Sequence, residues 1–81
     1  MPNCSSKNKK HPLLISLGNA IKPRRKMLKL SQEDLALISD VDRSYVGCIE
    51  RGENNVAILT LNKLSSTLEL SLEELMKFAN L

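Results

Sequence analysis

Residues 30–52 read LSQEDLALISDVDRSYVGCIERG, a pattern that predicts two short helices with only a brief turn between them. Ser31 is an N-cap candidate, and the acids that follow it favour the positive end of a helix dipole. This helix should end near Asp40, because Asp tolerates a left-handed turn, and Asp42 then caps the next helix. Helices joined so closely cannot pack antiparallel, so they cross steeply and the second is presented at the surface.

The second helix of this pair, residues 43–51, has one apolar side and one side of small or hydrogen-bonding residues. On a helical wheel Val46 and Ile49 point the same way, with Glu50 at the edge of that face. The opposite face carries Ser44, Gly47, Cys48 and Arg51, flanked by Arg43 and Tyr45. An interior Gly costs about 1 kcal/mol relative to Ala, so this face makes sense if something bulky approaches the backbone. The major groove of DNA admits one helix.

Three further helices are expected, over residues 13–28, 58–68 and 72–79. Pro23 predicts a kink near residues 19–22, because an interior Pro removes a hydrogen bond. Leu61, Leu64 and Leu68 share one face, and the SLEE segment at Ser71 is a capping box. In the helix before the turn, the expected inner face is Leu35, Ala36 and Ile38. No strand is indicated, so the expected fold is all-α, a compact bundle of five helices.

The charge is distributed unevenly along the 81 residues, which allow one domain. Residues 1–30 carry eight Lys or Arg and no acid, whereas residues 31–81 carry four Lys or Arg and all nine acids. A one-signed patch suits a polyanion, but a merely solvated face explains it as well. Residues 1–11 have little apolar content and are expected to form a disordered basic tail, followed by a helical domain over residues 12–81.

Several function classes are excluded by composition. No apolar run approaches membrane-spanning length, and the polar start does not resemble a signal peptide. Cys4 and Cys48 lie far apart without metal-ligand spacing, so a reducing cytoplasm is the expected compartment. His11 is the single His, and no nucleophile is paired with a base, so no catalytic site, metal site or cofactor is expected.

Residues 30–52 resemble the helix-turn-helix of the Cro and phage-repressor class, the XRE-type regulators. The segments that carry the resemblance are Leu30–Glu33, Leu35–Ala36, Val41–Val46 and Ile49–Gly52, and it continues through Leu61, Leu64, Leu68 and Ser71–Leu75. Residues 42–47, with Ile49–Gly52 and Asn55–Val56, look most like controller proteins of restriction–modification systems. The resemblance implies a lambda-repressor-like domain that binds double-stranded DNA in a bacterial or phage-encoded, nucleoid-associated protein.

The resemblance also implies roles by position. Arg43, Ser44 and Tyr45 occupy the base-reading start of the second helix, where an Arg can reach two acceptors of guanine. Tyr45 is also compatible with a partly buried ring packed on the preceding helix. Contacts to the sugar-phosphate backbone, which fix register but carry little sequence information, are expected from Gln32, Arg51, Asn54 and Asn55.

Two charged residues are expected to be structural, because family members pair an Arg and a Glu at these positions. Arg25 and Glu50 should form an internal ion pair that joins residues 13–28 to the second helix of the pair. The chain departs from the family pattern at four positions. Pro23 interrupts a helix, Arg24 replaces an apolar residue, Lys29 stands at a left-handed turn that is usually Gly, and Asn54 stands where controllers often carry a cation.

Proteins of this class bind as homodimers, with recognition helices about 34 Å apart on a near-palindrome. The residues left over at the C-terminal end are the expected dimer interface, namely Leu70, Met76, Phe78 and Leu81. An alternative is that they complete a monomer core. RNA polymerase is a further candidate partner, through acids such as Glu33 and Asp34, which first-turn dipole effects also explain.

Other functions stay open at this level. A phage-type repressor or an antitoxin would share the same pattern. A different class is a protein-interaction module that pairs through the C-terminal helix, although Arg43, Ser44 and Gly47 would then have no use. Salt discriminates between the two classes, because DNA binding weakens steeply as salt rises, whereas an apolar contact does not.

Overall fold

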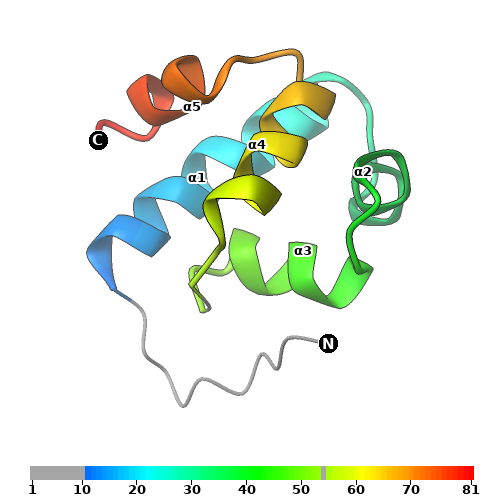
Figure 1. Cartoon of the computed structure of the whole chain (residues 1–81), viewed down its shortest axis with the longest axis horizontal. Coiled ribbons are helices and arrows are strands. Elements are labelled where there is room, and N and C mark those ends of the chain that lie inside the picture. The colour runs from blue at the N-terminus through cyan, green and yellow to red at the C-terminus, as the bar shows by residue number, and fades with distance from the viewer. Residues whose placement is uncertain (1–10, 54) are drawn as a thin grey trace.

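The computed structural model describes residues 11–53 and 55–81. Within these residues the chain forms five helices and no strand, which confirms the predicted fold class (Figure 1). The helices are α1 Pro12–Met27, α2 Gln32–Ser39, α3 Arg43–Glu50, α4 Ile58–Thr67 and α5 Leu72–Phe78. Of the predicted tail only His11 is described, and Asn54 also lies outside the described residues. None of the described helices is long and apolar enough to span a membrane.

The five helices end in the same way. A residue with positive φ lies at the C-cap of α2 and directly after the C-cap of the other helices, namely Asp40 and then Lys29, Gly52, Glu69 and Asn80. The next N–H then bonds back to the last turn, as in Leu30 N–H to the Arg25 carbonyl at 3.1 Å and Val41 N–H to the Ala36 carbonyl at 2.9 Å. This is the Schellman arrangement. It confirms the left-handed turns expected at Lys29 and Asp40.

Side-chain caps start four of the helices. Ser31 and Ser71 form capping boxes with Asp34 and Glu74, and Asp42 accepts the Ser44 N–H at 2.8 Å. The cap of α1 was not predicted: His11 Nδ1 accepts the Leu13 N–H at 3.1 Å. Pro12 at the first position of α1 was the available signal, because Pro is favoured there.

The core lies where α1 and α4 cross the α2–α3 pair, and α5 covers one end of it. Leu61, Leu64 and Leu68 are buried on one face of α4, as predicted. The expected inner face of α2 is wrong at one position. Ile38 is 62% exposed and Ser39 is buried instead, because the Ser39 hydroxyl bonds the Thr67 hydroxyl of α4 at 2.7 Å.

One glycine sets the distance between α1 and α3. A Cβ on Gly18 would lie 2.5 Å from the Glu50 carbonyl oxygen and 2.7 Å from that of Ile49. Only Gly therefore allows the backbones to meet there. This close crossing brings the middle of α1 against the C-terminal end of α3 and fixes the position of the surface helix.

Candidate nucleic-acid interface

The α2–α3 pair presents α3 along one edge of the molecule, with α5 at the opposite edge (Figure 1). Asp40, with φ of 59°, ends α2, and Asp42 caps α3 two residues later. Val46 and Ile49 are buried beneath α3, as the helical wheel predicted. The burial of this face leaves the N-terminal end of α3 facing solvent, with Arg43 and Ser44 both exposed.

A buried polar network holds α3 from behind. Arg25 of α1 donates to both carboxylate oxygens of Glu50, with Nε 2.6 Å from Oε2 and Nη2 3.0 Å from Oε1. The two side chains are 8% and 2% exposed. Arg25 also donates to the Leu30 carbonyl at 2.8 Å, and Gln32 Nε2 donates to Glu50 Oε1 at 3.0 Å. One carboxylate thus joins α1, α2 and α3.

The middle of α3 is less open than the sequence suggested. Gly47 and Cys48 were expected on the outward face, but both are buried. Cys48 is disulfide-bonded, which differs from the reduced cysteine expected from the sequence. Arg51 folds back along the helix beside both residues. Its Nη1 lies 3.2 Å from where a Cβ of Gly47 would be, and its Nη2 lies 3.7 Å from the sulfur of Cys48. Arg51 itself is exposed and pairs with Glu53 at 3.0 Å.

Tyr45 is half-buried against the core. Its hydroxyl donates to the Asn55 carbonyl at 3.3 Å and accepts the Ala57 N–H at 3.4 Å. The tyrosine therefore ties the start of α3 to the loop between α3 and α4. The sequence offered a base contact or a packed ring, and it gave no signal for this bond to the loop.

The predicted backbone-contacting residues lie around the same face. Gln32 and Arg51 meet over Gly47, because Oε1 of Gln32 lies 3.6 Å from the Cβ position of that glycine. Asn55 is exposed in the following loop, and Asn54 lies outside the described residues. The α2–α3 pair thus gathers polar side chains from α2, α3 and the loop onto one surface.

The four residues predicted for the dimer interface are not equivalent. The prediction of Leu70 as an exposed interface residue is wrong, because it follows the left-handed Glu69, turns inward and belongs to the core. Met76 is partly buried against the same core. Phe78 and Leu81 are 61% and 51% exposed. The sequence analysis also missed the exposed apolar side chains of Ile58 and Leu59 at the start of α4.

Two closely joined helices, with the second held at the surface by a buried network, define a helix-turn-helix protein. Residues 21–75 match the helix-turn-helix family, and the chain belongs to this family. Control protein C.MunI of a Mycoplasma species is 44% identical over 62 residues, which are 75% of this chain and 84% of that protein. Control protein C.SmaI of Serratia marcescens is 40% identical over 60 residues, 74% of this chain and 71% of that protein.

Solved structures give the same result. The restriction–modification controller protein C.AhdI from Aeromonas hydrophila is 42% identical, with a TM-score of 0.74 over 76% of this chain and 94% of its own. A nucleoprotein complex of C.Esp1396I is 37% identical, with a TM-score of 0.71 over 83% of this chain and 92% of its own. These likenesses confirm the resemblance to controller proteins that the sequence indicated.

Proposed function

We propose that the protein is a transcriptional regulator that binds a near-palindromic operator as a homodimer and controls a restriction–modification system. The observation that carries this proposal is how α3 is held against the other helices. Its N-terminal end is exposed at Arg43 and Ser44, while its C-terminal end is clamped through Glu50 to α1 and α2. A rigidly held helix is what precise placement in a groove needs.

The two exposed residues divide the base reading between them. The guanidinium of Arg43 can donate two hydrogen bonds to O6 and N7 of a guanine, which is worth about 1–3 kcal/mol of discrimination. The hydroxyl of Ser44 contacts the neighbouring base edge or phosphate. Tyr45 contributes indirectly, because its hydroxyl donates to the Asn55 carbonyl and so positions the loop that carries Asn55.

Backbone contacts set the register of the helix in the groove. Gln32, Arg51 and Asn55 approach phosphates on either side of α3. Gln32 also bonds Glu50, so the same side chain links a phosphate contact to the internal clamp. The relative C.Esp1396I forms a nucleoprotein complex, which supports nucleic acid as the partner.

The test is selection of bound sequences from a random double-stranded DNA pool. We expect a near-palindrome with a guanine in each half-site. Arg43→Ala should lose the preference at that base pair and keep the rest of the site. The matched control is Lys77→Ala, which removes an exposed cation from α5, far from α3. A failure to enrich any sequence, or binding indifferent to salt, would overturn the proposal.

A further inference from the structure

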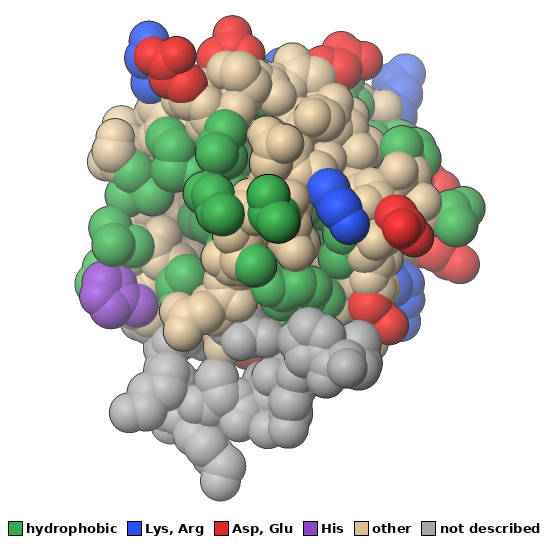
Figure 2. Space-filling model, viewed as in Figure 1, with side chains coloured by type: hydrophobic (Ala, Val, Ile, Leu, Met, Phe, Trp, Pro, Cys, Tyr) green, Lys and Arg blue, Asp and Glu red, His purple; other side chains and the backbone are tan. Residues whose placement is uncertain are grey.

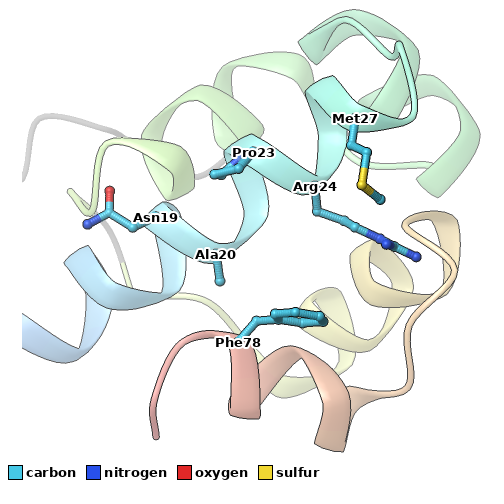
Figure 3. Close-up of a pocket in the computed structure, with 6 residues that line it drawn as sticks. All are labelled: Asn19, Ala20, Pro23, Arg24, Met27 and Phe78. Atoms are coloured by element: carbon cyan, nitrogen blue, oxygen red, sulfur yellow. The ribbon is translucent and has the colours of Figure 1, made fainter.

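A pocket of about 350 Å³ lies between α1 and α5, away from the α2–α3 pair (Figure 3). Its lining residues are Asn19, Ala20, Pro23, Arg24, Met27 and Phe78. Figure 3 shows Ala20 pointing toward the ring of Phe78, while the Arg24 side chain extends away from α1 toward the end of α4. Most of the wall is therefore apolar, and one cation enters it.

The guanidinium of Arg24 is oriented but not neutralised. Its Nε donates to the Leu68 carbonyl at the end of α4, at 2.9 Å. Among the described residues the only ion pairs are Arg25–Glu50 and Arg51–Glu53. Arg24 therefore forms no ion pair with a carboxylate of these residues. No acid lines the pocket either. Arg24 is half-exposed, and its terminal nitrogens are donors that an anion could accept from.

Pro23 leaves one backbone carbonyl of α1 without its usual partner. Because Pro has no N–H, the Asn19 carbonyl four residues earlier in α1 lacks its usual helical donor. The two α1 residues that depart from the family pattern, Pro23 and Arg24, therefore both line this pocket. The DNA-reading surface of α3 makes no use of either residue.

We propose that this pocket binds a small molecule with an apolar body and a carboxylate. The volume suits a small ligand. Its apolar part would pack against Ala20, Met27 and Phe78, two of which are exposed large side chains. Its carboxylate would accept from the free end of Arg24. The site goes beyond the proposed DNA reading, because none of its lining residues belongs to α2 or α3, and it shares only Phe78 with the predicted dimer interface.

The probe is 4-phenylbutyrate, with 4-phenylbutanol as its uncharged partner, titrated into the full chain and followed by amide chemical shifts. We expect saturable shifts at Ala20, Met27 and Phe78 that leave Arg43 unmoved. The alcohol should bind about tenfold more weakly, since a charge-assisted bond is lost. Comparing two ligands on the unaltered protein keeps the test independent of whether a variant folds.

Two variants localise the effect. Arg24→Lys, which keeps the charge but loses the fork, should weaken binding of the acid and leave the alcohol unchanged. Lys26→Ala, an exposed neighbour outside the pocket, should change neither. The proposal is overturned by shifts that do not saturate, by equal affinity for acid and alcohol, or by equal losses in the two variants. It is also overturned if raising the protein concentration abolishes the ligand-induced shifts at Ala20 and Met27, because a second copy would then fill the groove.

Discussion

At the scale of single residues, Glu50 does the most to fix the interface. Its carboxylate is nearly without solvent contact and is met by Arg25 and Gln32. A buried charge is tolerated only when it is paired and its lone pairs are satisfied. Every buried side-chain N or O atom of the described residues has a hydrogen-bond partner. The network is therefore complete, and the loss of one member leaves the remaining buried groups without a partner.

Arg25→Ala should lower the free energy of unfolding by about 3 kcal/mol or more, because Glu50 is left buried and unpaired. Urea denaturation followed by circular dichroism measures this. DNA affinity should fall along with stability. Lys26→Ala is the control, since it removes an exposed neighbouring cation. An Arg25→Ala protein with wild-type stability and weaker DNA binding would mean that Arg25 contacts DNA directly.

Lys29 illustrates a different residue-scale cost, that of a side chain in a left-handed turn. Its φ is 62° and its side chain is exposed, so it stabilises nothing by packing. Lys29→Gly should raise the free energy of unfolding by about 1 kcal/mol and the melting temperature by about 5 °C. Lys29→Ala keeps the Cβ and should show no such gain. Equal melting temperatures for the two variants would contradict the strain argument.

At the scale of elements, two glycines play opposite parts. Gly18 lets α1 touch the backbone of α3, where a Cβ would meet carbonyl oxygens that cannot move without shifting a helix. Gly47 lies under the end of the flexible Arg51 side chain, which can swing away. The sequence raised the question of Gly47 but did not single out Gly18, because its partner is thirty or so positions away along the chain.

The same added methyl group should therefore have opposite effects at the two positions. Gly18→Ala should lower the free energy of unfolding by about 1–3 kcal/mol through overpacking. Gly47→Ala should raise it by up to about 1 kcal/mol through helix propensity, while weakening DNA binding if α3 approaches the groove closely. Paired denaturation curves and DNA titrations measure both. Destabilisation of equal size at both sites would refute the distinction.

At the scale of the whole molecule, nine large hydrophobic side chains of the described residues are exposed to solvent, and apolar surface of this kind often marks an interaction site when it is contiguous. Hydrophobic side chains gather on the face that carries α4 and α5, and acidic side chains lie along the edge near α5 (Figure 2). The core of an 81-residue chain is small, so a second copy covering part of this surface would add stability.

If the end of α5 pairs with a second copy, Leu81→Asp should weaken the homodimer by burying a charge in the contact. Sedimentation velocity across a range of concentrations would show the shift toward monomer, and DNA affinity should fall with it. Leu37→Asp makes the same change at an exposed position on α2 and should leave the assembly intact. Dissociation by Leu37→Asp alone would move the interface to α2.

The sequence by itself determined the five helices, the caps at Ser31, Asp42 and Ser71, and the left-handed turn at Asp40, whereas the pairing of Arg25 with Glu50 came from the family resemblance. Caps and left-handed turns depend on neighbours within a few residues, and the reading helix shows in its own periodicity. Only the tertiary structure decided that Ile38 faces solvent, that Leu70 is core, that Arg51 covers Gly47 and that Tyr45 holds a loop. These four features depend on contacts between α2, α3, α4 and the loops. The burial of a residue is set by the segments that the folded chain packs against it, and periodicity within one helix does not specify those segments.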